Sequence, residues 1–194
     1  PGTIGNLTPG GKILASLFQS VTLRTAGFAS FNQDALTEAS KALSDLLMFV
    51  GGSSGSTAGG VKTVTMGLVI LSAVSTMRGR RQVTVLGRSI SQEDIANAVS
   101  IALLVMGLSL LGAAVITVCD GCSFMNAIYE TISALCTVGL TTGITPTLCT
   151  ASKLILIVFM FFGRVGIMTI GVGFMMGDRA KERVQYAQTK VMIG

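Results

Sequence analysis

A Thr-x-Gly motif occurs twice in this chain, and the residues around both copies match at one constant spacing. Residues 23–28 read Leu-Arg-Thr-Ala-Gly-Phe, and residues 135–140 read Leu-Cys-Thr-Val-Gly-Leu. The same offset of 112 residues pairs further identical residues, namely Leu36 with Leu148, Ala39-Ser40-Lys41 with Ala151-Ser152-Lys153, Met48-Phe49 with Met160-Phe161, and Gly51 with Gly163. The chain therefore contains at least one and a half copies of a unit built around a Thr-x-Gly turn.

The composition is that of a membrane protein. Half of the 194 residues are apolar and only 12% are charged, whereas roughly a quarter of the residues in a soluble domain are charged; the mean hydropathy is +0.72. The basic residues concentrate in segments 78–88 and 179–190, which favours cytoplasmic flanks over a nucleic-acid surface. We expect a multi-pass protein of the plasma (inner) membrane. With no His and no nucleophile and base paired at a motif spacing, we do not expect an enzyme.

Two segments have helical character but are too short to cross a bilayer. Residues 11–23 would rise only about 20 Å, and a spanning helix needs about 20 apolar residues. We therefore expect this helix to enter the membrane and turn back at residues 25–28, and residues 124–142 repeat the pattern. A re-entrant helix with such a turn presents backbone carbonyls to a dehydrated cation; an interfacial helix with a tight turn is the alternative. The predicted fold class is an all-α membrane protein of helix, re-entrant pore-loop, helix repeats with a broken transmembrane helix.

The apolar segment 36–77 is interrupted by Gly, Ser and Thr at residues 51–63. As one helix the segment would rise about 63 Å, twice the roughly 30 Å hydrocarbon core, so we expect the helix to break there. Non-helical backbone at membrane depth lines water or is buried in protein. We predict that this stretch is a gate beneath the filter, the site where the Thr-x-Gly turns would present carbonyls to the cation. A surface linker is the alternative. A phosphate-binding loop is disfavoured because Val61 separates Gly60 from Lys62.

The other segments predict the topology. Residues 78–92 form a cytoplasmic loop, and residues 95–118 carry no charge and span the membrane, so both Thr-x-Gly turns lie outside. Acidic residues on that side would attract cations, or they are solvated loop charges with no role; they are Asp34, Glu38, Asp120 and Glu130.

Apart from Lys153 at its start, Arg164 is the single charge within the last apolar span, residues 153–176. A charge at that depth faces a cavity or a partner by default. The offset of 112 pairs it with Gly52, at the level of the Gly/Ser stretch. We expect Arg164 to form a positive barrier there or to donate to loop carbonyls; a snorkelling or structural arginine is the alternative.

Four segments together resemble the Trk/Ktr/HKT potassium transporters, most of all the Ktr membrane subunit. They are Ser-Val-Thr-Leu-Arg-Thr-Ala-Gly-Phe at 20–28, Gly-Gly-Ser-Ser-Gly-Ser-Thr-Ala-Gly-Gly-Val-Lys at 51–62, Thr-Val-Gly-Leu-Thr-Thr at 137–142 and Phe-Gly-Arg-Val-Gly at 162–166. The resemblance covers essentially the whole chain. It implies the C-terminal half of such a protein, with the third and fourth of four pore repeats around one pore. Because the chain starts at Pro1, with neither Met nor a signal sequence, we also expect it to be a piece of a longer one.

The resemblance implies the following layout. Residues 1–77 are the third repeat without its first helix, with pore helix and filter at 11–28, a broken helix at 36–77 and a gating loop at 51–62. Residues 78–92 are a cytoplasmic loop, and residues 178–194 are a cytoplasmic tail. Residues 93–177 are a complete fourth repeat, with its first helix at 93–118, pore helix and filter at 124–142 and last helix at 148–177.

The resemblance also implies the site residues. Gly27 and Gly139 are two of four filter glycines, and the residues beside them lend carbonyls to potassium. The implied filter residues are Thr25, Ala26, Gly27, Phe28, Thr137, Val138, Gly139 and Leu140. The implied gating loop comprises Gly51, Gly52, Ser53, Ser54, Gly55, Ser56, Thr57, Ala58, Gly59, Gly60 and Lys62, with Arg164 near it. Arg24, inside the first motif, is expected to turn its head away from the ion.

Family membership implies partners and cargo. The expected assembly is a homodimer in membrane lipid, seated on a cytosolic ring of nucleotide-binding regulatory subunits that faces residues 78–92 and the tail. The cargo is K⁺, with Na⁺ possible, and no cofactor or nucleic acid is expected. With half of the pore missing, these residues alone are not expected to conduct unless two copies, or the absent half, complete the four-fold filter. Two other functions remain open from the residues, a tetrameric cation channel subunit and an alternating-access carrier.

Overall fold

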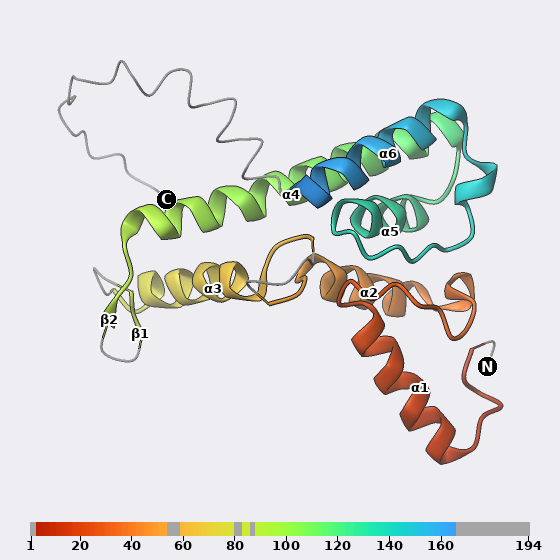
Figure 1. Cartoon of the computed structure of the whole chain (residues 1–194), viewed down its shortest axis with the longest axis horizontal. Helices are drawn as coiled ribbons and strands as arrows, with labels where there is room; N and C mark the ends of the chain where they lie inside the picture. The colour runs from red at the N-terminus through yellow and green to blue at the C-terminus, as the bar shows by residue number, and fades with distance from the viewer. Residues whose placement is uncertain (1–2, 54–58, 80–82, 86–87, 166–194) are drawn as a thin grey trace.

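The computed structural model describes residues 3–53, 59–79, 83–85 and 88–165, and in these residues the chain is helical apart from one pair of very short strands (Figure 1). The elements in chain order are α1 (Pro9–Thr22), the 3₁₀ turn η1 (Gln33–Ala35), α2 (Glu38–Phe49), α3 (Thr63–Met77), β1 (Thr84–Val85), β2 (Arg88–Ser89), α4 (Gln92–Asp120), α5 (Phe124–Leu135), the 3₁₀ turn η2 (Thr145–Thr147) and α6 (Thr150–Val165). The prediction of a helical fold is confirmed.

The strands β1 and β2 are a departure from that prediction. They pair antiparallel, with Thr84 opposite Ser89 and Val85 opposite Arg88. Both lie inside the segment expected to be a cytoplasmic loop. Thr and Val favour extended backbone, but two residues per strand are too few for a period-two pattern, so no sequence pattern indicated this pair.

Local sequence explains where the helices begin and end. Thr8, Thr37 and Ser91 each accept a backbone N–H with their side-chain oxygen at the start of α1, α2 and α4, as capping residues do. Gly121 ends α4 in the left-handed region with φ 64°, where a glycine has no Cβ to clash.

The helix α4 is the one described helix that is long and apolar enough to cross a membrane. Its 29 residues rise about 43 Å at 1.5 Å per residue, which exceeds a hydrocarbon core of about 30 Å. The segment 36–77 is instead two shorter helices, because α2 ends at Phe49 and α3 begins at Thr63. The last predicted helix is described only as far as Val165, and the rest of it lies outside the described residues.

Between α2 and α3 the two ends of the Gly/Ser stretch meet. Val50 and Val61 form an isolated parallel bridge. Gly51 N donates to Val61 O at 2.9 Å, and Val61 N donates to Phe49 O at 3.3 Å. The chain therefore leaves α2 and returns to α3 at nearly the same point.

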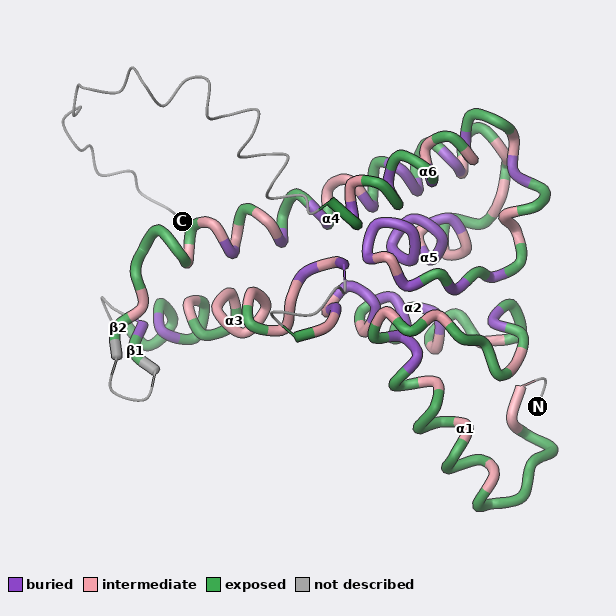
Figure 2. The backbone as a smooth tube through the Cα atoms, in the orientation of Figure 1, coloured by how far each residue is buried: buried purple, intermediate pink, exposed green. Residues whose placement is uncertain are grey.

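The helix α5 forms the centre of the core (Figure 2). Every residue from 129 to 135 is buried, and α5 packs against α2, α4 and α6. Gly112 on α4 makes this packing possible, because a Cβ there would overlap the ring of Phe159 and would lie 3.1 Å from Thr131 Cγ2. The core is thus built around the second of the two short helices.

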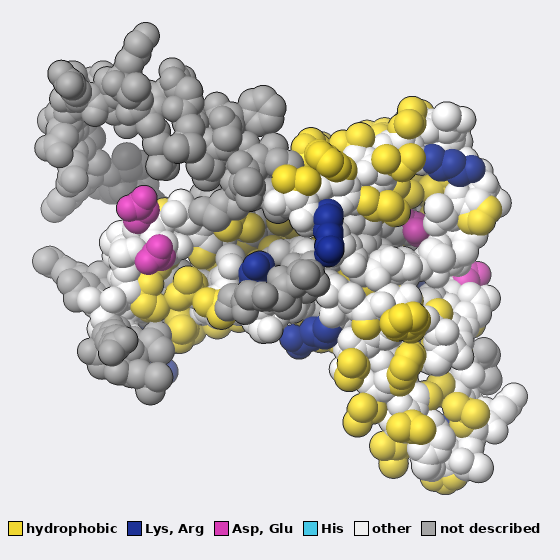
Figure 3. All heavy atoms as spheres, in the orientation of Figure 1, with side chains coloured by type: hydrophobic (Ala, Val, Ile, Leu, Met, Phe, Trp, Pro, Cys, Tyr) yellow, Lys and Arg dark blue, Asp and Glu magenta, His cyan; other side chains and the backbone are white. Residues whose placement is uncertain are grey.

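The helix α1, in contrast, projects away from the other helices (Figure 1), and Figure 3 shows hydrophobic side chains gathered over it. The apolar side chains exposed along it are Ile13, Leu14, Leu17, Phe18 and Val21.

The spacing of 112 residues recurs in the structure. The 3₁₀ turns begin at Gln33 and Thr145, and the helices after them begin at Glu38 and Thr150. Lys41 Nζ contacts Asp34 Oδ1 at 3.3 Å, and the equivalent Lys153 Nζ donates at 2.9 Å to the carbonyl oxygen of Pro146, the equivalent position. We call α1 to α2 the first unit and α5 to α6 the second unit.

Candidate functional site

The Thr-x-Gly turns of the two units lie against each other. A Cβ built on Gly27 would overlap the carbonyl oxygen of Val138 and would lie 3.7 Å from the Cα of Gly139. Gly27 also has φ +75°, and Gly139 has φ +87°, a region that glycine enters without steric cost. The fold therefore brings together the two glycines that the sequence singled out.

Both threonines of the motifs occupy the left-handed region. Thr25 has φ 63° and Thr137 has φ 54°, and they are the positive-φ non-glycine residues among the described ones. Positive φ is a genuine outlier for a β-branched residue. Such strain costs about 1–3 kcal/mol and clusters at functional sites. The same strain at the same position shows that the two turns share one backbone conformation.

Each turn is held by the last turn of the helix before it. Thr22 donates its hydroxyl to Phe28 O at 2.7 Å and accepts from Phe28 N at 2.8 Å, while its carbonyl accepts from Gly27 N at 3.1 Å. In the second unit Ser133 donates its hydroxyl to Leu140 O at 2.6 Å, and its carbonyl accepts from Val138 N at 2.9 Å. The short helices therefore fix the path of the turns.

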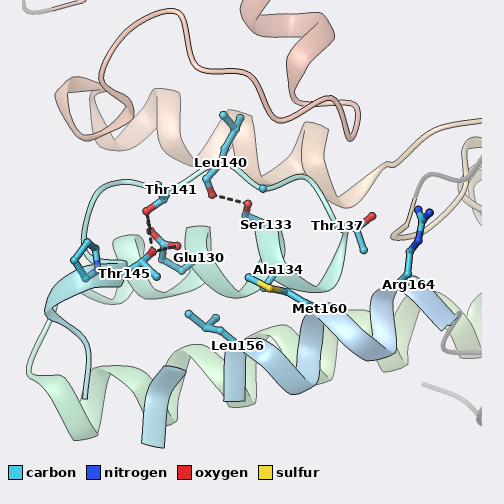
Figure 4. A pocket seen from close by; sticks show the side chains of 12 residues that line it. Glu130, Ser133, Ala134, Thr137, Leu140, Thr141, Thr145, Leu156, Met160 and Arg164 are labelled. Carbon is cyan, nitrogen blue, oxygen red and sulfur yellow. Dashed lines mark hydrogen bonds between the residues drawn. The ribbon is translucent and has the colours of Figure 1, made fainter. Parts of the chain in front are cut away.

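A buried carboxylate organises the chain that follows the second turn (Figure 4). Glu130 on α5 is only 5% exposed. Its Oε1 accepts from the Thr141 hydroxyl at 2.6 Å and from the Thr142 N–H at 2.9 Å, and its Oε2 accepts from the Thr145 hydroxyl at 3.0 Å. Two alternatives were open for the outer acidic residues, a mouth that attracts cations and solvated loop charges with no role, and the second alternative is wrong for Glu130 because its side chain is buried and hydrogen-bonded. The run of threonines at 141–147 is the one signal that could have suggested it.

Two of the other acidic residues also have partners inside the protein. Asp34 pairs with Lys41, whose Nζ also donates to Asn126 Oδ1 on α5 at 2.8 Å. Asp120 accepts from the N–H of Cys149 at 2.6 Å and from the hydroxyl of Ser152, so it caps the start of α6. Glu38 stays exposed.

A cavity of about 550 Å³ lies between α5, the second turn and α6. Thr137 and Gly139 of the turn line it together with Glu130, Met160 and Arg164. In Figure 4 Arg164 lies on α6 beyond Met160, at the same end of the cavity as Thr137. The arginine is exposed and stands in the last described turn of α6.

The described C-terminal end of the Gly/Ser stretch reaches the second turn. Gly59 N donates to Thr137 Oγ1 at 3.0 Å. A Cβ on Gly60 would lie 2.9 Å from the Cys136 Sγ. Of the residues assigned to the gating loop, Ser54, Gly55, Ser56, Thr57 and Ala58 lie outside the described residues.

The two units are also joined by polar contacts away from the turns. Gln33 is 2% exposed, and its Oε1 accepts from Gln19 Nε2 on α1 at 2.7 Å and from the Tyr129 hydroxyl on α5 at 3.2 Å. These bonds and the Lys41 contact fix the first unit against α5, and so they support the approach of the turns.

Comparison with known proteins gives one consistent result. The family model described as TrkH, cation transport protein, matches residues 2–182. Ktr system potassium uptake protein B of Bacillus subtilis (strain 168) is 37% identical over 194 residues, which is 100% of this chain and 43% of that protein. Potassium/sodium uptake protein NtpJ of Enterococcus hirae is 34% identical over 94% of this chain and 42% of its own length. Ktr system potassium uptake protein B of Vibrio alginolyticus is 33% identical over 100% of this chain and 42% of its own length.

Fold and site define a helical membrane protein in which two short helices each end in a strained Thr-x-Gly turn and bring the turns together. The chain belongs to the TrkH family of cation transport proteins, and the resemblance to Trk/Ktr potassium transporters is thereby confirmed. It spans about two fifths of the length of these curated relatives.

Proposed function

We propose that this chain supplies two of the filter segments of a protein that takes up potassium across the plasma membrane. The observation that carries the proposal is the approach of Gly27 to Val138 and Gly139, because carbonyls that meet at one point can replace the hydration shell of a cation. In this proposal the ion contacts the backbone of Thr25 and Ala26 in one turn and of Thr137 and Val138 in the other. The names of the relatives support K⁺ as the main cargo and, for one of them, Na⁺ as well.

The Gly/Ser stretch 51–62 and Arg164 are proposed to control this path. The stretch begins and ends at one point, between Val50 and Val61, and its C-terminal end touches the second turn. Arg164 lines the cavity that also contains Thr137. A positive charge there would oppose the passage of a cation. A loop that moves and an arginine that repels would together set the flux.

The assembly is proposed from family membership. The resemblance to the Ktr branch, to which relatives named "Ktr system" belong, implies a homodimer in the plasma membrane, seated on a cytosolic ring of nucleotide-binding regulatory subunits. The segments proposed to face that ring are residues 78–92, which include β1 and β2, and residues 178–194. Crosslinking of the purified full-length protein tests the dimer, and a single monomer band would contradict it.

The filter proposal is tested by substituting its two glycines in the full-length protein that contains this chain. Potassium uptake is measured in cells that lack their own potassium uptake systems. Gly27→Ser places a side chain on the Val138 carbonyl, so we expect uptake to fall about tenfold or more, the equivalent of about 1.4 kcal/mol. Gly139→Ser meets nothing within 4 Å but strains a φ of +87°, so a smaller fall of about fivefold is expected.

The matched control is Gly67→Ser on α3, where a Cβ would also meet nothing within 4 Å and the backbone is helical. Its uptake should equal that of the unchanged protein. The proposal fails if Gly27→Ser, present in the membrane at normal amounts, takes up potassium at the rate of this control.

A further inference from the structure

The side chain of Gln33 forms a bridge between the two short helices. It is 2% exposed. Its Oε1 accepts from Gln19 Nε2 on α1 at 2.7 Å and from the Tyr129 hydroxyl on α5 at 3.2 Å. Its Nε2 donates to Phe31 O at 3.1 Å and to Gln19 Oε1 at 3.4 Å. Because a carbonyl oxygen only accepts, the bond to Phe31 O fixes the orientation of the amide and leaves Oε1 to face the two helices.

The bridge holds each helix about one turn before the residue that holds its filter turn. Gln19 lies three positions before Thr22, and Tyr129 lies four positions before Ser133. Thr22 and Ser133 are the residues whose hydroxyls bind the backbone of the two turns. Residues three or four positions apart lie on the same face of a helix. The bridge therefore connects the two helix ends that carry the filter turns.

The second unit has a different arrangement at the same positions. The equivalent of Gln33 is Thr145, which donates to Glu130 Oε2 on its own short helix at 3.0 Å (Figure 4). The equivalent of Gln19 is Thr131, which donates to a backbone carbonyl of α4 at 3.1 Å. In the described part of the chain, neither threonine side chain makes a hydrogen bond to the first unit. The bridge is therefore particular to this junction and does not follow from the repeat.

Burial makes the bridge difficult to replace with water. Tyr129 is 0% exposed, and a buried polar group that loses its partner is unfavourable. The two turns also lie in direct contact, because a Cβ on Gly27 would overlap the Val138 carbonyl oxygen. A displacement of α1 relative to α5 would therefore change the separation of the two turns.

We propose that Gln33 and Tyr129 are positioning residues that set the separation of the two filter turns and thereby the preference of the filter for K⁺ over Na⁺. The inference rests on the proposed function and adds the residues that determine its selectivity. Carbonyls spaced for K⁺ reject Na⁺ only while their spacing is fixed, because the smaller ion needs oxygens that lie closer to it. A junction without the bridge can contract around Na⁺.

The test measures K⁺ flux and Na⁺ flux through the full-length protein in liposomes. Tyr129→Phe keeps the ring and removes only the hydroxyl, and Gln33 Oε1 keeps its bond from Gln19. The net contribution of one hydrogen bond corresponds to about a two- to tenfold shift in an equilibrium. We expect Tyr129→Phe to lower the ratio of K⁺ flux to Na⁺ flux about threefold, through a rise in Na⁺ flux. Gln33→Leu removes the bonds to both helices and should lower the ratio about fivefold.

A control and a double variant separate positioning from a merely structural role. Ser109→Ala removes a buried hydroxyl that donates to Val105 O within α4, and it should leave the ratio unchanged. In the Gln33→Leu variant, Tyr129→Phe should have no further effect, because residues that act through one contact are non-additive. A role in stability alone would lower the Tm, or both fluxes in proportion, and would not change the ratio.

Three results would overturn the inference. They are an unchanged ratio in Tyr129→Phe, an equal fall in Ser109→Ala, and the same fall for Tyr129→Phe with and without Gln33→Leu. The glycine variants separate this inference from the proposed function. If Gly27→Ser lowers uptake and Tyr129→Phe leaves the ratio unchanged, only the inference on selectivity fails. If Gly27→Ser takes up potassium at the rate of Gly67→Ser, the proposed function fails as well.

Discussion

The two units have the same turn conformation in very different surroundings. Phe28 of the first turn is 70% exposed, whereas the equivalent Leu140 is 3% exposed. The helix α1 displays five large apolar side chains, while the last seven residues of α5 are all buried. Both turns nevertheless place Thr and Gly at positive φ. The conformation of the turn is therefore set by its own sequence and by the helix end before it, and the packing around it is set by other helices.

Two features that distinguish the second unit from the first account for its burial. The first is α4, which packs against α5 and α6 through Gly112. The second is Glu130, which collects donors from residues 141–145. The position equivalent to Glu130 in the first unit is Phe18, whose side chain is 41% exposed.

The largest effect on stability is expected at Glu130, the buried charge that the first unit lacks. Glu130→Ala would leave the Thr142 N–H and the hydroxyls of Thr141, Thr142 and Thr145 without the carboxylate that accepts from them. Hydrogen bonds to charged groups contribute about 1.5–3 kcal/mol. We expect a loss of about 3 kcal/mol in unfolding free energy, measured as a lower Tm of the full-length protein in detergent. Phe18→Ala is the control at the equivalent position and should change stability by less than about 1 kcal/mol. Equal losses would show that the units do not differ in this way.

A smaller effect is expected at the contact with α4. Gly112→Ala would push the Phe159 ring away, and overpacking of this kind costs about 1–3 kcal/mol. Gly107→Ala is on the same helix but meets nothing within 4 Å, so it should be neutral or slightly stabilising. The measurement is again Tm in detergent. If both variants behave alike, α4 is not what makes the second unit compact.

The smallest effect on stability is expected at Arg164, whose equivalent position in the offset of 112 residues is Gly52. Arg164→Ala removes an exposed charge, and such substitutions usually change stability by less than about 0.5 kcal/mol. We nevertheless expect resting potassium flux to rise about two- to threefold, because the positive field at the cavity weakens. Lys153→Ala on the same helix is the charge-matched control, with unchanged flux. A lower Tm at unchanged flux for Arg164→Ala would favour the structural alternative.

The sequence was sufficient for features that depend on a few neighbouring residues. The Thr-x-Gly turns and the break between α2 and α3 at the Gly/Ser stretch follow from glycine freedom and from the length of a helix that can fit in a membrane. The burial of Glu130 did not follow, because it requires the chain to fold back after the turn so that Thr142 and Thr145 meet α5. The bond from Gly59 to Thr137 links positions 78 residues apart, and no local pattern encodes such a distance.

The cap that Asp120 places on α6 has a mechanical consequence. Because Asp120 binds the N–H of Cys149 and the hydroxyl of Ser152, the N-terminal end of α6 is hinged to the end of α4. A rigid helix held at one end moves most at its other end. The 16 residues of α6 form a helix about 24 Å long, and its far end moves about 4 Å when the helix tilts by about 10°. The tip carries Gly163 and Arg164, so a small rotation at the Asp120 end of the helix is amplified where the helix meets the second turn.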